Sequence, residues 1–225
     1  MKFRKIHSWN LTPQQAIRLQ NELKQKIKLK KFTTLPKLIA AADVAFKKGK
    51  AIGIAVVLSY PEFKVIEWVH KISKITYPYI PGLLTFREGP VLEKCFRALK
   101  NEPEVIIFDG QGLAHPRNMG LATHLGILLD KPSIGCAKTY LFGKYVVPKK
   151  TRGAFSYLLD RQGKKIGAVL RTKDKVKPVY VSCGYKIDLN SSIKIILQCT
   201  KKYRLPEPLR IADYLTKAVK KFYIQ

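Results

Sequence analysis

Apolar positions in the first third of the chain predict a helix followed by three strands. Thr12 and Gln15 form a capping box around Pro13, a residue that suits the first position of a helix. Three apolar segments follow, separated by short turn-forming stretches: Leu38–Phe46, Ala51–Tyr60 and Lys64–Ile72. Connections this short join antiparallel neighbours, so the segments predict a three-stranded antiparallel meander.

The rest of the chain predicts alternating helices and strands. We expect a helix beginning at Gly89-Pro90, a strand at Glu104–Phe108, a helix near 118–129, a strand at Ser133–Ala137, a hairpin-like pair at Lys165–Arg171 and Val179–Ile187, and helices near Ser191–Tyr203 and Pro208–Phe222. No repeat, low-complexity tract or linker divides the chain. This order predicts one α/β domain over residues 1–225, with a mixed central sheet of three antiparallel strands followed by parallel strands, flanked by helices.

The charge balance is strongly basic. The 225 residues include 43 Lys and Arg against 15 Asp and Glu, a formal net charge of +28, and 46% of the residues are hydrophobic. Such an apolar content excludes a disordered basic tail. The excess charge fits a polyanionic partner, and equally a lysine-coated surface that aids solubility or suits a hot environment. Charge alone leaves both interpretations open.

Membrane and disulfide signals are absent from the sequence. No apolar run approaches the roughly 18 residues of a membrane span, and the N-terminus lacks the apolar core of a signal peptide. We therefore expect a soluble, cytoplasmic monomer without a membrane partner. The four cysteines lie far apart and form no C-x-x-C pair, so we expect reduced thiols in or near the core.

Four acidic residues stand out because acids are rare in this chain. Asp43 lies within the apolar strand at 38–46, and Asp109 ends the apolar strand at 104–108. Glu88 precedes the expected helix after the meander, and Asp213 lies in the last helix. A structural salt bridge explains any one of them. Together, on strands expected to be neighbours, they predict a site for Mg²⁺ or Mn²⁺, hard ions that bind oxygen and activate water for phosphodiester hydrolysis.

Other side chains are expected at the same edge of the sheet. The glycine-rich segment Asp109–Gly120 carries His115 and Arg117, which suits close approach of a base or phosphate. Lys138 follows the strand at 133–137 and would project beside it. Tyr79 lies between two prolines, a stiff tip that could enter a base stack. A proline-rich loop folded over the core explains Tyr79 equally well.

Motifs in sequential order resemble those of the endonuclease V family of deoxyinosine-directed nucleases. They extend across essentially the whole chain: Ala41–Val44, Tyr79–Glu88, Asp109–Gly120, Gly135–Lys138 and Arg204–Asp213. The resemblance implies an RNase H-like fold and a DNA repair endonuclease that recognises deoxyinosine. It implies hydrolysis of the second phosphodiester bond 3′ to the lesion by Mg²⁺-activated water, with Mn²⁺ as a substitute, leaving 3′-hydroxyl and 5′-phosphate ends.

The resemblance also implies roles for individual residues. Asp43, Glu88 and Asp109 match the metal-binding acids, Asp213 matches a fourth acidic position, and Lys138 matches a lysine near the scissile phosphate. The base pocket and the strand-separating wedge match Tyr79, Ile80, Pro81, Gly82, Leu84, Gly110, His115 and Gly120.

Two other functions remain open on the sequence. The same fold could act mainly on inosine in RNA or on branched or flap DNA, because sequence does not show how the 2′-hydroxyl is treated. A non-catalytic nucleic-acid binder on a nuclease-like scaffold would predict a missing acid, whereas all four acids are present.

Overall fold

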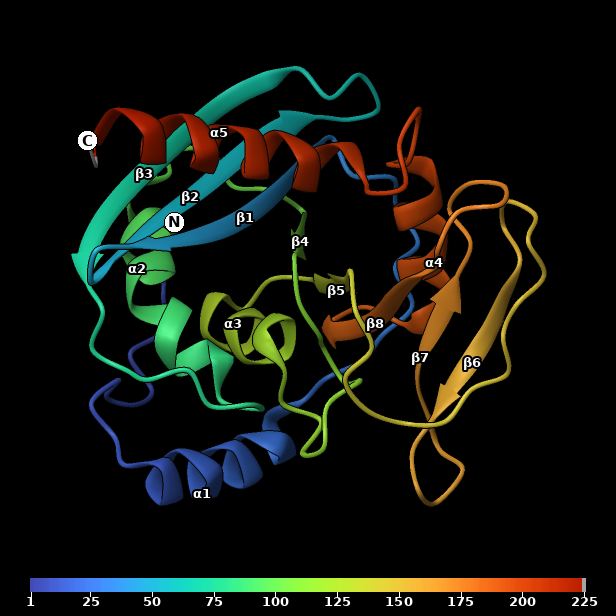
Figure 1. Cartoon of the computed structure of the whole chain (residues 1–225), viewed down its shortest axis with the longest axis horizontal. Helices are drawn as coiled ribbons and strands as arrows, with labels where there is room; N and C mark the ends of the chain where they lie inside the picture. Colours follow the sequence, from blue (N-terminus) through green and yellow to red (C-terminus); the bar gives the residue numbers. More distant parts are fainter. Residues whose placement is uncertain (224–225) are drawn as a thin grey trace.

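A computed structural model describes residues 1–223 as an eight-stranded mixed sheet with helices on both faces (Figure 1). The strands are β1 (Leu38–Lys47), β2 (Lys50–Ser59), β3 (Val65–Lys74), β4 (Val105–Phe108), β5 (Ser133–Ala137), β6 (Phe155–Leu159), β7 (Lys165–Leu170) and β8 (Val179–Tyr185). The helices are α1 (Pro13–Leu23), followed by the 3₁₀ turn η1 (Lys24–Lys26), then α2 (Leu84–Ala98), α3 (Leu121–Leu129), α4 (Leu189–Gln198) and α5 (Glu207–Tyr223).

The strand order is β3-β2-β1-β4-β5-β8-β7-β6. The first three strands are antiparallel neighbours, and β4 and β5 continue beside β1 in parallel. The remaining strands pair antiparallel. The predicted mixed sheet, with a meander followed by parallel strands, is therefore confirmed, and the parallel part consists of the β1-β4-β5 run.

Two helical layers enclose this sheet. Helices α4 and α5 cover one face, where Ile193, Ile196 and Ala212 pack against strand residues such as Ile107. Helices α2 and α3 cover the other face, with Phe96 and Leu125 packed against Phe108. Figure 1 shows α5 and α2 on opposite sides of β1 and β2. Because β4 is buried by both layers, its apolar residues are continuous and do not alternate with polar ones.

One predicted helix boundary was wrong, and one strand was not predicted. Helix α2 begins at Leu84, so Gly89 and Pro90 lie inside it. The extra turn is stabilised by burial of Thr85 and Phe86, and this tertiary packing outweighs the helix-breaking tendency of proline. Strand β6 was not predicted, because its residues are largely exposed and show no clear apolar alternation.

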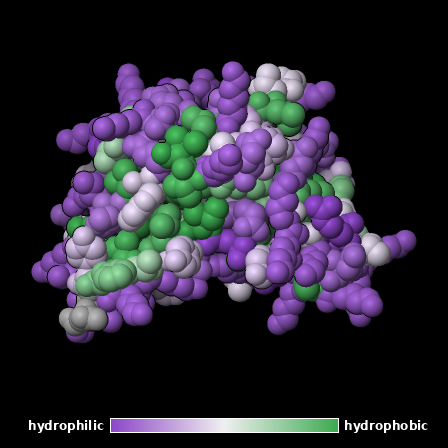
Figure 2. Space-filling model, turned by 90° about the horizontal axis from the view of Figure 1, so that it is seen from above, coloured by the Kyte–Doolittle hydropathy of each residue, from purple (hydrophilic) through white to green (hydrophobic). Residues whose placement is uncertain are grey.

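The surface and the cysteines agree with the sequence predictions. Hydrophilic side chains cover most of the face seen from above, with an apolar patch among them (Figure 2). All four cysteines are buried free thiols. None of the helices described in residues 1–223 combines the length and the apolar character needed to cross a membrane.

Candidate active site

Two acidic residues come together where the central parallel strands meet. The register pairs Ala42 of β1 with Phe108 of β4, and the next residues along the two strands are Asp43 and Asp109. Both acids line one cavity of about 650 Å³. Ligand sites in sheets of this kind lie at the carboxyl ends of parallel strands, and Asp109 has that position directly after β4. Asp43 lies level with it in the middle of β1, where the parallel pairing with β4 ends.

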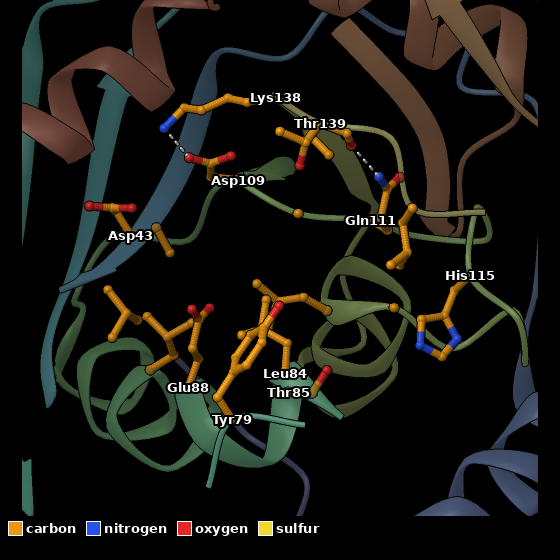
Figure 3. Close-up of a pocket in the computed structure, with 18 of the residues that line it drawn as sticks. Asp43, Tyr79, Leu84, Thr85, Glu88, Asp109, Gln111, His115, Lys138 and Thr139 are labelled. Carbon is orange, nitrogen blue, oxygen red and sulfur yellow. Dashed lines mark hydrogen bonds and ion pairs between the residues drawn. The ribbon is translucent and has the colours of Figure 1, made fainter. Parts of the chain in front are cut away.

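Glu88 faces these two aspartates from helix α2 (Figure 3). Its sequence neighbourhood suggested a position before the helix, but the earlier start of α2 places it one turn inside. Part of the side chain still faces the cavity, yet burial of its carboxyl and the nearby charges of Asp43 and Asp109 raise the pKa of Glu88 to about 8. Burial likewise raises the pKa of Asp43, opposed by a hydrogen bond from Thr216 and reinforced by Asp109. The three carboxylates therefore destabilise one another in the absence of a cation.

Lys138 supplies one such cation. Its Nζ lies 2.5 Å from Oδ2 of Asp109, directly after β5 (Figure 3). Burial alone would lower the pKa of Lys138, but the hydrogen bond to Asp109 and the charges of Asp43 and Asp213 raise it. Asp213 of α5 also lines the cavity and forms an ion pair of 2.6 Å with Lys217. The acids are thus partly neutralised by lysines at the cavity wall.

The carboxylates suit a hard divalent cation by their chemistry. Oxygen ligands of negative charge are those that Mg²⁺ and Mn²⁺ prefer, and a bound cation would offset the repulsion that raises the pKa values of Asp43 and Glu88. Within residues 1–223, no three His, Cys, Asp or Glu side chains are arranged as a ready-made metal site. Asp109 is paired with Lys138 through Oδ2, so Oδ1 is the oxygen of this carboxylate that would bind a shared ion.

The residues predicted to form the base pocket and the wedge lie in the same cavity as the acids. Tyr79 points into it from the loop before α2, opposite Lys138 and Thr139 (Figure 3). The residues that the resemblance assigned to the site all line this one cavity: Asp43, Tyr79, Ile80, Pro81, Gly82, Leu84, Glu88, Asp109, Gly110, His115, Gly120, Lys138 and Asp213. Arg117, which the sequence also placed at this edge, does not line the cavity and instead contacts Gln20 and Gly82. The structure therefore brings together side chains from five separate parts of the chain.

A polar network holds Gly82 at the base of the wedge. His115 donates from Nε2 to the carbonyl oxygen of Gly82 over 3.0 Å, and Arg117 donates to the same oxygen over 2.9 Å. The Nδ1 atom of His115 accepts from the backbone N–H of Arg117. Burial and the charge of Arg117 lower the pKa of His115 to about 4, so the ring is neutral near pH 7 and carries its proton on Nε2.

The sequence did not reveal one member of this network. Gln20 of α1 is fully buried; its amide nitrogen donates to the carbonyl oxygens of Gly82 and Met119, and its Oε1 accepts from Arg117 over 2.6 Å. The sequence signal for a buried Gln20 was its position on the same helix face as Ala16 and Leu23, both of which are buried. His124 of α3 is fully buried, and its ring lies against those of His7 and Phe86.

The sequence and the fold are both similar to those of known proteins. A family model described as Endonuclease V matches residues 21–214. The chain is 45% identical over 216 residues to endonuclease V of Methanothrix thermoacetophila, covering 96% of each chain. The crystal structure of endonuclease V from Streptomyces avermitilis superimposes with a TM-score of 0.90 at 36% identity, covering 98% of both chains.

A third relative was solved with nucleic acid. Endonuclease V of Ciona intestinalis, in complex with a 24mer DNA containing an inosine followed by a ribo-adenosine, superimposes with a TM-score of 0.80. The two chains are 29% identical, with 91% of this chain and 96% of that one covered. Given the family model and the curated relatives, this chain belongs to the endonuclease V family.

Proposed function

We propose that this protein is a DNA repair endonuclease that recognises deoxyinosine and hydrolyses the second phosphodiester bond 3′ to it. The products are 3′-hydroxyl and 5′-phosphate ends, and residues 1–225 act as a single catalytic domain. The observation that carries the proposal is one cavity lined by four carboxylates, three lysines and the Tyr79–Gly82 tip. The Ciona relative, solved with inosine-containing DNA, supports the choice of lesion.

Recognition starts with the strand and the flipped base. The excess of basic residues attracts the DNA, and Lys217 and Lys220 of α5 carry this positive charge to the cavity wall. The Tyr79–Gly82 tip enters the base stack, and the cavity receives the everted hypoxanthine. The position of the tip is fixed because His115 and Arg117 both donate hydrogen bonds to the carbonyl oxygen of Gly82. Neutral His115 can hold that bond at physiological pH.

Hydrolysis takes place beside the acids. Asp43, Glu88 and Asp109 would hold Mg²⁺, or Mn²⁺ in its place, which supplies Lewis acidity for activating water and stabilising the leaving oxygen. Lys138 leaves Asp109 and contacts a non-bridging oxygen of the scissile phosphate. Thr216, whose hydroxyl donates to the carbonyl oxygen of Ala212 over 2.8 Å, lies beside Asp43 and would turn this hydroxyl to the carboxylate to orient it. Asp213, paired with Lys217, adds a fourth negative charge at the wall.

The proposal is tested by nicking of defined duplexes. With Mg²⁺, the purified protein should nick a duplex containing one deoxyinosine and leave the matched adenine duplex intact, and EDTA should stop the reaction. Asp43→Ala should abolish nicking while the binding of inosine DNA persists, because binding depends on the lysines and the cavity. Equal nicking of both duplexes would refute the lesion specificity. Nicking by Asp43→Ala at the wild-type rate would refute the role of the acids.

The choice between deoxyinosine in DNA, inosine in RNA and flap DNA is tested with the same protein. A matched strand carrying inosine in RNA, and a flap duplex without inosine, distinguish the deoxyinosine activity from the alternative functions. We expect the deoxyinosine duplex to be the best substrate of the three. A higher kcat/KM on the RNA or the flap would replace the proposed substrate by that one.

A further inference from the structure

Tyr140 is an exposed aromatic residue at the rim of the catalytic cavity, and none of the roles above involves it. It lies two residues after Lys138 and lines the same cavity as Tyr79. About half of the residue, 49% of its surface, is exposed. An exposed aromatic ring beside a nucleic-acid site suits stacking contact with a nucleobase.

The ring of Tyr140 is held on one side and open on the other. Its hydroxyl donates to the carbonyl oxygen of Gly143 over 2.6 Å. The ring centroid lies 6.0 Å from that of Tyr145 and 6.0 Å from that of Tyr180. Tyr180 belongs to β8 and pairs there with Ala137, the residue before Lys138. The aromatic cluster is therefore built on the sheet, next to the strand end that carries the catalytic lysine.

The loop that carries Tyr140 is itself fixed to the sheet. Lys144 and Leu159 exchange two backbone hydrogen bonds, of 2.7 and 2.9 Å. Gly143 has a φ of +106°, and a Cβ atom there would lie 2.8 Å from the carbonyl oxygen of Leu159. Only glycine fits this turn without strain, and the turn presents the carbonyl that accepts the Tyr140 hydroxyl. The ring is therefore oriented before any ligand binds, so little conformational entropy is lost when it makes a contact.

We propose that Tyr140 is a stacking platform for a nucleobase that adjoins the scissile phosphate, at the rim of the cavity that Tyr79 also lines. The inference rests on the proposed function, in which Lys138 contacts the scissile phosphate. Tyr140 comes two residues after Lys138 in the chain, so its ring would lie near the nucleotide at that phosphate. A fixed aromatic face binds any base by stacking, irrespective of sequence. Tyr79 would then separate the strands, while Tyr140 would align the backbone of the nucleotides 3′ to the lesion for the cut.

The test uses 2-aminopurine, a fluorescent base whose emission falls when it stacks. It is placed in turn at the first, second and third positions 3′ to deoxyinosine, and EDTA keeps the strand intact. The wild-type protein should quench one of these positions more than the others. Tyr140→Leu should lose that quenching and weaken binding by about 5- to 150-fold, the range expected for one lost base stack. Tyr140→Phe keeps the ring and should stay within a few-fold of wild type.

Controls and kinetics separate stacking from a structural role. Phe155→Ala removes an aromatic residue of similar exposure, 42%, that does not line the cavity, and should bind and quench like wild type. With Mg²⁺, Tyr140→Leu should raise KM more than it lowers kcat. A melting temperature of Tyr140→Leu equal to that of wild type confirms that the fold is intact.

Three outcomes would overturn the inference: no position-specific quenching by the wild type, wild-type quenching by Tyr140→Leu, or equal losses in Tyr140→Phe and Tyr140→Leu. Failure of the proposed function has a different signature. If the wild type nicks inosine and adenine duplexes equally while Tyr140-dependent quenching persists, the lesion specificity falls and the stacking role stands. If inosine nicking is specific and Tyr140→Leu behaves as wild type, only the stacking role falls.

Discussion

The substitution Glu88→Gln should make the metal-free protein more stable at high pH. The pKa of Glu88 rises from the ordinary value of 4.5 to about 8 in the fold, chiefly because its carboxyl is buried and secondly because Asp43 and Asp109 are near. Between these two pH values the folded protein binds more protons than the unfolded chain. Its stability therefore falls as the pH rises through this window. Glutamine cannot ionise, so the variant lacks this loss.

The magnitude follows from the pKa change. Each pKa unit is worth about 1.4 kcal/mol, so the full change would cost the wild type about 5 kcal/mol at pH 9. Because part of Glu88 faces the open cavity, solvent screening reduces this, and we expect about 2–3 kcal/mol. For a protein of this size such a difference raises the melting temperature by about 5–10 °C.

The assay is urea unfolding of both proteins in EDTA at pH 5, 7 and 9. The stability advantage of Glu88→Gln should be small at pH 5 and grow toward pH 9. Adding Mg²⁺ at pH 8 should stabilise the wild type more than the variant, because the variant lacks one carboxylate. A stability difference that does not change with pH would refute the argument that Glu88 is forced toward its protonated form.

Three further substitutions test the packing around the site. A Cβ at Gly89 would lie 2.3 Å from the Trp9 ring, so Gly89→Ala should lower the free energy of urea unfolding by about 1–3 kcal/mol. If the variant is as stable as the wild type, the Trp9 ring can move aside without cost and the argument is wrong. A Cβ at Gly112 would lie 2.1 Å from the carbonyl oxygen of Cys183, so Gly112→Ala should displace the glycine-rich loop. We expect this variant to lose the preference for inosine DNA in a binding assay, and a preference equal to that of the wild type would contradict the argument. Ile107 is fully buried in β4, and Ile107→Ala should cost about 2–5 kcal/mol in the same unfolding assay; a cost below about 1 kcal/mol would show that the core closes around the gap.

The sequence predicted best the parts of the fold whose signal is local. Strand β5 has the predicted bounds, Ser133–Ala137, because an apolar run ends there at a lysine. The neighbouring positions of Asp43 and Asp109 followed from two apolar strands that each carry one acid. An acid inside an apolar strand needs a specific environment, so its position is informative even without a structure.

The parts that the sequence did not predict depend on contacts between distant segments. The first turn of α2 forms because Phe86 packs against the N-terminal segment and α1, which no local pattern encodes. Gln20 reaches Gly82 and Arg117, residues 62 and 97 positions away. Lys138 was expected at this edge of the sheet, but its ion pair with Asp109 depends on the β4–β5 register and was not predicted.

The most direct test of the account maps the cut on a labelled duplex. The strand carries a 5′ label and one deoxyinosine, and the products formed with Mg²⁺ are sized at single-nucleotide resolution beside an adenine control. We expect one product, ending in a 3′-hydroxyl at the second phosphodiester bond 3′ to the inosine, and no product from the control. Cutting of the control at a similar rate, or products scattered along the strand, would contradict it.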